Sequence, residues 1–143
     1  MNLEHCGLVL SNANDQVESK FESESFLTGS EIANMQLGRV DLVVLSACDS
    51  GVGEQYAGEG PIGLQRAFHF AGARSVIASL WNVDDKLARL IMRRFYDNLL
   101  NQNMTKASAL RDAQLGMRNG ELTGGEPQPP QAWAGWILSG AED

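Results

Sequence analysis

Two apolar stretches, Val40 to Ala47 (VDLVVLSA) and Ser75 to Trp81 (SVIASLW), decide the fold class of this chain. Both are near-continuous runs rich in Val, Ile and Leu. Such runs are typical of strands that are buried on both faces, as in a parallel sheet covered by helices. Two further short apolar runs, Leu8–Leu10 and Trp133–Leu138, predict two more strands.

Helix signals lie between these strands. Thr28-Gly29-Ser30-Glu31 fits a capping box, which predicts a short helix through Met35 that ends near Gly38. Pro61 suits a first helical position, and Gly72 predicts the end of that helix.

Two more helices are expected before the last strand. Asp84 or Asp85 can cap the first, and Thr105 opens the second, which Gly120 closes. The apolar stripe of the first helix comprises Leu87, Leu90, Ile91, Phe95 and Leu99. The alternation of strands and helices predicts an α/β fold, a mainly parallel sheet with helices on both faces.

Composition limits the function. The 143 residues suit one domain, and the net charge of −7 argues against a nucleic-acid partner. The chain has no apolar run of about 18 residues, so no membrane span is expected. Cys6 and Cys48 cannot form a disulfide framework, and no Cys/His group has zinc spacing. We therefore expect a reduced, cytosolic protein that uses neither a metal nor a cofactor.

The loop after the first long strand carries the strongest chemical signal. Cys48 follows Val40–Ala47 directly, and glycine-rich residues 52–63 lead from it toward the next helix. Working groups in such sheets gather beyond the carboxyl ends of the strands. The backbone N–H of Cys48 is a candidate donor to an oxyanion. From the residues alone, a lone cysteine after a strand is more often an inert small core residue.

Residues 40–91 resemble the CHAT domain, a bacterial caspase-like cysteine peptidase family often found behind helical repeats. The resemblance rests on four motifs in this order: Ser-Ala-Cys-Asp-Ser-Gly, Gly-Glu-Gly, Ala-Gly-Ala-Arg-Ser-Val and Ser-Leu-Trp-Asn-Val-Asp-Asp. Residues 7–11 and 26–28 look like the family's small hairpin, and residues 132–136 look like its closing strand.

The resemblance implies a caspase-like three-layer fold and a Cys–His endopeptidase with Cys48 as nucleophile. By this resemblance the chain is a single partial domain, incomplete at its N-terminus. Its expected parts are a hairpin and loop (1–28), a core with the nucleophile (29–119), a linker (120–132) and a closing strand (133–143).

The catalytic base of the family is missing from the sequence. The CHAT histidine belongs to a His-x-x-x-His-Gly stretch that would precede Met1. His5 is not followed by glycine, and His69 lies on a helix that leads away from the thiol. Without a base a thiol stays mostly protonated at neutral pH, since its ordinary pKa is about 8.5. We expect the chain alone to have little or no peptidase activity.

Four acidic residues are candidates for substrate binding: Asp84, Asp85, Asp49 and Glu59. Related peptidases that cut after basic residues place an acid in the region of Asp84 and Asp85, so a basic P1 residue is expected. The alternative role for Asp84 or Asp85 is helix capping. Trp81 and Trp136 sit in apolar runs and are expected to be core residues.

Two other functions remain open. The chain could be a non-catalytic interaction module that kept the fold, or a small ligand-binding protein with Cys48 as a redox thiol. The expected partners are a protein or peptide substrate, the preceding part of the same domain, and helical repeats. An uncovered sheet edge would also favour homo-oligomers.

Overall fold

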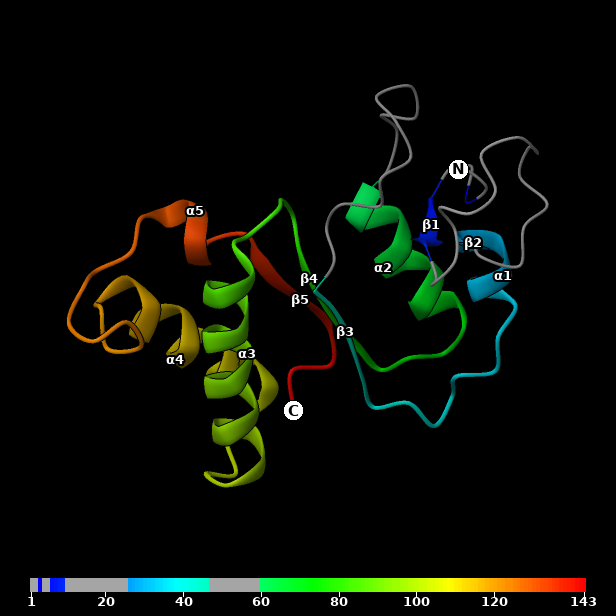
Figure 1. Cartoon of the computed structure of the whole chain (residues 1–143). Helices are drawn as coiled ribbons and strands as arrows, with labels where there is room; N and C mark the ends of the chain where they lie inside the picture. The colour runs from blue at the N-terminus through cyan, green and yellow to red at the C-terminus, as the bar shows by residue number, and fades with distance from the viewer. Residues whose placement is uncertain (1–2, 4–5, 10–25, 47–59) are drawn as a thin grey trace, which may run out of the picture.

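The computed structural model describes residue 3 and residues 6–9, 26–46 and 60–143 (Figure 1). Cys48, Asp49, Glu59 and His5, which the sequence analysis discussed, lie outside these ranges. The strands are β1 (Gly7–Val9), β2 (Phe26–Thr28), β3 (Leu42–Leu45), β4 (Ser75–Ser79) and β5 (Trp136–Gly140). The helices are α1 (Gly29–Ala33), α2 (Gly60–Phe70), α3 (Asp85–Leu100), α4 (Lys106–Arg118) and α5 (Pro130–Trp133).

The strands form two sheets among the described residues. A small antiparallel pair joins β1 to β2, with Leu8 opposite Leu27, as the hairpin expected from the sequence requires. The central sheet has the order β3-β4-β5. Its β3–β4 pair is parallel, with Leu45 opposite Ala78, and its β4–β5 pair is antiparallel, with Ser79 opposite Trp136. The fold is α/β, as predicted, but the described central sheet is mixed rather than mainly parallel.

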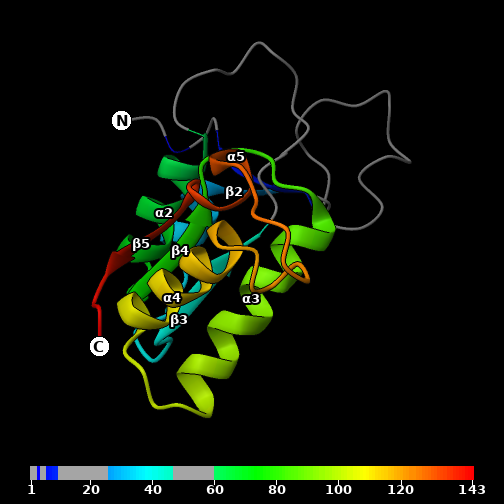
Figure 2. The same cartoon turned by 90° about the vertical axis from the view of Figure 1, so that its left-hand side faces the viewer.

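The path of the chain after β4 explains the antiparallel strand. A single crossover helix returns the chain to the start of the neighbouring strand and so produces a parallel pair. Here two helices intervene: α3 runs away from the carboxyl end of β4, and α4 packs against α3 and runs back (Figures 1 and 2). The chain therefore re-enters the sheet at the edge where β4 ends, and β5 must run in the opposite direction.

Two hydrophobic cores lie on the two faces of the sheet. The consecutive β4 residues Val76 and Ile77 are both fully buried, and they belong to different cores. Val76 packs with α1 and α2 through residues such as Ile32 and Leu64. Ile77 packs with α3 and α4 through residues such as Phe95. Side chains alternate across a strand, so a continuous apolar run fills both cores, and helices cover both faces (Figure 1).

The sequence predicted most helix starts correctly. Thr28 and Glu31 form the capping box: the Glu31 amide donates to Thr28 Oγ1 at 3.2 Å, and the Thr28 amide donates to Glu31 Oε2 at 2.8 Å. Asp84 caps α3, and Thr105 caps α4. The end of α1 was placed too late, because the helix stops at Ala33, well before the expected end near Gly38. Gly72 has a φ of +102°, as a glycine terminator after α2 requires.

The segment before the last strand differs from expectation. Trp133–Leu138 was predicted as a strand, yet Trp133 ends the short helix α5 and the strand begins at Trp136. Pro130 occupies the start of α5, where its missing N–H costs nothing. The expected linker 120–132 therefore includes most of a helical turn, and Trp133 donates through its indole to Gln128 O at 3.1 Å.

A cluster of charged residues lies at the end of the central sheet where β3 and β4 begin. Lys106, at the start of α4, is 3% exposed, and its Nζ lies 3.0 Å from Asp41 Oδ2. It also donates to the main-chain oxygen of Asp143. Arg74 pairs with both acids, at 3.5 Å from Asp41 and 3.2 Å from Asp143. The cluster thus joins the chain before β3, the chain before β4, α4 and the segment after β5.

No helix among the described residues is long and apolar enough to cross a membrane.

Candidate active site at the carboxyl edge of the sheet

The parallel pair β3–β4 creates a shared edge. β3 ends at Leu45 and β4 ends at Ser79, and Leu45 pairs with Ala78, so the loops after both strands leave the sheet side by side. The Ser-Ala-Cys motif begins at Ser46, directly after β3. The structure therefore places the start of this motif at the edge where the turn between β4 and α3 begins. We call this turn, residues 80–84, the Trp81 turn. Cys48 and the acids Asp49 and Glu59 belong to the part of the loop outside the described residues.

Asp84 has a structural role that its position in the turn already suggested. Its Oδ1 accepts hydrogen bonds from the amides of Lys86 at 2.9 Å and Leu87 at 3.3 Å, which makes it the N-cap of α3. Asp85 follows in the first turn, where a carboxylate interacts favourably with the helix dipole. Both side chains are exposed beside the carboxyl edge. The capping alternative is thus confirmed for Asp84.

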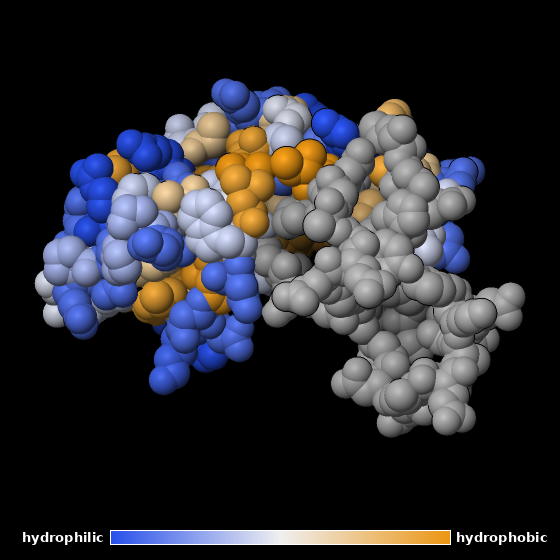
Figure 3. Space-filling model, turned by 90° about the horizontal axis from the view of Figure 1, so that it is seen from above, coloured by the Kyte–Doolittle hydropathy of each residue, from blue (hydrophilic) through white to orange (hydrophobic). Residues whose placement is uncertain are grey.

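The two tryptophans expected in the core have different environments. Trp136 is 2% exposed and belongs to the α3–α4 core, as predicted. Trp81 is 40% exposed, so the core assignment was wrong for this residue. Two other large apolar residues near the same edge are also exposed, Leu80 at 39% and Ile62 at 48%. Figure 3, which looks down on this edge, shows apolar residues that reach the surface.

Although exposed, Trp81 is held firmly. Its indole Nε1 donates to Gln131 O at 2.7 Å, which ties the β4–α3 turn to α5. A Cβ atom built on Gly135 would lie 2.7–3.0 Å from three atoms of the indole, so one face of the ring rests on that glycine. In the sequence, the only sign of this contact is Gly135 within Trp-Ala-Gly-Trp. A glycine alone does not show which side chain packs on it.

His69 lies far from the candidate edge. Its Nδ1 is 3.1 Å from Ala73 O, and its Nε2 is 2.9 Å from Ser139 Oγ. Ser139 pairs with Val76 near the start of β4, at the opposite end of the sheet from Trp81. His69 therefore lies at the end of the sheet away from the carboxyl edge, as its place on a helix leading away from the Cys48 loop predicted. In the described part of the chain, no group of three His, Cys, Asp or Glu residues could hold a metal ion.

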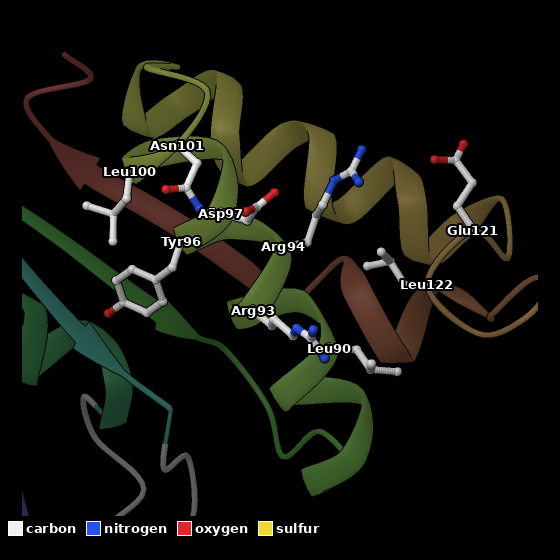
Figure 4. Close-up of a pocket in the computed structure, with 9 residues that line it drawn as sticks. All are labelled: Leu90, Arg93, Arg94, Tyr96, Asp97, Leu100, Asn101, Glu121 and Leu122. Carbon is white, nitrogen blue, oxygen red and sulfur yellow. Dashed lines mark hydrogen bonds between the residues drawn. The ribbon is translucent and has the colours of Figure 1, made fainter.

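A groove of about 590 Å³ lies on the outer side of α3, further from the carboxyl edge (Figure 4). Its lining mixes charges, with Arg93 and Arg94 beside Asp97 and Glu121. Arg94 points toward α4 and lies 2.7 Å from Asp112 Oδ2. Hydrogen bonds from Arg94 and Asn98 lower the pKa of Asp112 below its ordinary value. None of the candidate site residues lines this groove, and its Arg94 is already paired with Asp112.

Comparison with known proteins decides the family. A family model described as the CHAT domain matches residues 1–141. The chain belongs to the CHAT domain family. This CHAT chain is also 32% identical over 119 residues to tetratricopeptide repeat protein 28 of Homo sapiens, and 31% identical to the protein of that name from Mus musculus. Each alignment covers 83% of this chain and only 4% or 5% of the relative. These mammalian relatives give no support to the bacterial association expected from the sequence.

Proposed function

We propose that this CHAT chain is the nucleophile-bearing part of a caspase-like cysteine endopeptidase, with Cys48 as nucleophile. The supporting observation is the shared edge of β3 and β4, which is followed on one side by Ser-Ala-Cys and on the other by the Trp81 turn. Helices on both faces of the sheet agree with a three-layer caspase-like fold. The antiparallel β5 is a closing strand at one side of that layer.

The proposed reaction needs a proton acceptor. The thiolate sulfur attacks a peptide carbonyl carbon, the C–N bond breaks, and the leaving amine takes the proton that the thiol gave to the base. Water then hydrolyses the thioester and restores the thiol. The backbone N–H of Cys48 would stabilise the oxyanion. His69 is at the wrong end of the sheet, and His5 lacks the glycine that follows the family histidine, so we propose that neither is the base and that the family's His-Gly segment supplies it.

The experiment compares two proteins with one another. One is this chain, and the other is a longer protein in which a preceding segment supplies a strand that ends in His-Gly. We expect peptide turnover by the longer protein, its loss on Cys48→Ala, and none by the chain alone. Cys6→Ala is the matched control, because Cys6 is a buried thiol 3.6 Å from Leu3 O. Turnover by the isolated chain that Cys48→Ala abolishes would contradict the requirement for an external base.

Acidic groups at the edge would set the specificity of this peptidase. Asp85 is exposed, and Asp84 uses Oδ1 for capping, so a cationic P1 side chain has carboxylates to meet beside the strand ends. Asp49 and Glu59 are the further candidates on the Cys48 loop. A fluorogenic panel on the longer protein tests this preference, and a preference for acidic P1 would contradict it. A thiol enzyme of this kind would suit a reducing, cytosolic compartment.

The second candidate function is a protein-interaction module without catalysis. The relatives are named for tetratricopeptide repeats, and they extend far beyond the matched segment, so helical repeats are the proposed neighbours. β3 favours association as well: its four residues are apolar and only half-buried, whereas all of β4 is buried. Such an edge can pair with another strand, including one from a second copy. Light scattering checks self-association, and a monodisperse monomer would argue against it.

A further inference from the structure

One face of α3 points away from the core and is exposed or half-buried along its whole length. At about 100° per residue, positions 86, 90, 93, 97 and 100 fall within roughly 80° of arc. The opposite side of the helix carries its buried residues, Ile91, Phe95 and Asn98. We call the exposed set the outer α3 face; it comprises Lys86, Leu90, Arg93, Asp97 and Leu100.

The outer α3 face lines the groove shown in Figure 4, together with residues 121 and 122 beyond α4. Leu100 is 70% exposed, which is the highest value for a large apolar residue in the described part of the chain. Tyr96, which lines the same groove, is 40% exposed. The groove therefore offers apolar area that a second helix can cover, because helices pack by placing side-chain ridges into such grooves.

The charges of this face select the partner. Among the ion pairs of the described residues, none involves Arg93 or Asp97, whereas Arg94 is held by Asp112. Asp97 and Glu121 line the same groove as Arg93, so the face carries both signs. A phosphate-rich partner would meet these carboxylates, and the net charge of −7 disfavours it further. The face fits a polypeptide that carries both signs in the matching order.

The order of residues along the outer α3 face matches itself in the opposite direction. In an antiparallel pair of copies, Leu90 lies beside Leu100 of the partner subunit, and Arg93 lies beside Asp97 of the partner subunit. Two-fold symmetry repeats both contacts. The alternating steps of four and three residues are those of the contact positions in paired helices. A parallel pair in register would place arginine against arginine and aspartate against aspartate, and like charges repel.

We propose that the outer α3 face is a dimer interface, at which α3 of a second copy of this chain packs antiparallel along the groove. The leucines bury apolar area, and the two Arg93–Asp97 ion pairs fix direction and register. A helix of 16 residues is about 24 Å long, so the interface is small and the dimer is weak. We expect a dissociation constant of about 10–500 µM, so the dilute chain is monomeric.

This interface is separate from both functions proposed above. None of its residues belongs to the Ser-Ala-Cys motif, to the Trp81 turn or to the β3 edge. Loss of the dimer on substitution of α3 therefore leaves the peptidase proposal standing. Conversely, absence of peptide turnover by the longer protein leaves the α3 interface standing.

A charge swap tests the proposed register. Sedimentation equilibrium of the chain from about 5 µM to about 1 mM, under reducing conditions, measures the dimer. Arg93→Asp and Asp97→Arg should each weaken it about 10-fold or more, because each places like charges opposite one another. The double variant Arg93→Asp/Asp97→Arg restores opposite charges and should return the dissociation constant to within about 3-fold of wild type.

The control for the altered net charge is Arg39→Asp, an exposed residue between α1 and β3, which should leave the dimer unchanged. Because Arg93 and Asp97 form no ion pair within the described structure of one chain, rescue reports a contact between chains. A wild-type chain that is monomeric at every concentration would overturn the proposal. So would a double variant that is as weak as the single variants.

A second pair of variants tests the apolar contact. Leu100→Glu places a charge at the end of the interface and should abolish the dimer. Phe70→Glu is the matched control, since Phe70 is 67% exposed at the end of α2, on the other side of the sheet. Circular dichroism shows that both variants fold. Self-association that survives Leu100→Glu, or that Phe70→Glu removes equally, would place the interface elsewhere and refute the inference.

Discussion

The Nε atom of Arg94 lies 2.7 Å from Oδ2 of Asp112, and this ion pair joins the middle of α3 to the middle of α4. Asn98, which is 3% exposed, donates to the same oxygen at 2.6 Å. One carboxylate thus satisfies two donors of the neighbouring helix. Because α3 and α4 return the chain to the carboxyl edge, this contact helps to fix the direction of β5 and the position of α5 under Trp81.

The stability contributed by Asp112 should depend on pH. Its folded-state pKa is lowered, by hydrogen bonds from Arg94 first and Asn98 second. The contribution is therefore fully present above the pKa of an unfolded aspartate, about 3.9, and is lost as pH falls through the lower folded-state value. We expect Asp112→Asn to cost about 0.5–1 kcal/mol at pH 7, since both partners are more than one-third exposed.

The measurement is urea unfolding of both proteins between pH 7 and pH 3. The difference in unfolding free energy should shrink below about pH 4. Asp97→Asn, an exposed carboxylate on α3 that accepts from Asn101, controls for the loss of one negative charge. A difference between wild type and Asp112→Asn that grows toward low pH would contradict the assignment.

The buried Lys106 predicts an asymmetric double-mutant cycle. Asp41→Ala leaves a 3% exposed ammonium without its carboxylate, whereas Lys106→Met removes the charge and keeps an apolar stem of similar shape. Unpaired buried charges cost more than replaced pairs, so Asp41→Ala should cost about 1–3 kcal/mol and Lys106→Met less. In the Lys106→Met background, Asp41→Ala should cost almost nothing further. Additive free energies in chemical denaturation would show that the pair does not interact.

Gly140 should be intolerant of a side chain. Its φ is +94°, and an added Cβ would meet the carbonyl oxygen of Arg74 and lie 2.8 Å from His69 Cε1. Gly140→Ala therefore combines backbone strain with a clash, and we expect a loss of more than about 2 kcal/mol. Gly124→Ala is the matched control: its φ is +73° and nothing lies within 4 Å, so strain alone should cost about 1–2 kcal/mol. Thermal melts that rank the two variants in the opposite order would refute the close approach.

Truncation of a buried side chain on β4 should lower the unfolding free energy far more than truncation of an exposed side chain on α3. Ile77 is fully buried between the sheet and α3–α4, and Ile77→Ala should cost about 2–5 kcal/mol. Leu100 is 70% exposed at the end of α3, and Leu100→Ala should change the unfolding free energy by less than about 0.5 kcal/mol. Denaturant unfolding measures both, and similar losses would mean that another chain covers the Leu100 face.

The elements with strong local signals were predictable. The capping box at Thr28, the N-cap Asp84 and the terminator Gly72 depend on hydrogen bonds and backbone angles within a few residues, so sequence spacing reveals them. The inward residues of α4, Ala109 and Met117 among them, follow the helical period and are buried. The short helix α5 was missed, because four residues give no period and the aromatic sequence around it resembles a strand.

The candidate site was predictable only in part. Sequence position put the Trp81 turn and the Ser-Ala-Cys motif at one edge, since parallel strands end together. It could not show that Trp81 is exposed, because apolar neighbours favoured a core role and the residue's contacts come from Gln131 and Gly135, more than 45 positions away. Similarly, the sequence around Lys106 could not show that this lysine is buried, because its partners Asp41 and Asp143 belong to distant segments.

The sequence by itself determined the fold class, the helix starts, the resemblance to the CHAT domain and the edge of the sheet at which a site would form. These follow from local hydrogen bonding, apolar periodicity and motif order. Only the tertiary structure decided the direction of β5, the burial of Lys106 and the fixed, exposed position of Trp81. Each of these depends on contacts between distant segments, and local interactions leave such contacts undetermined until both cores are packed.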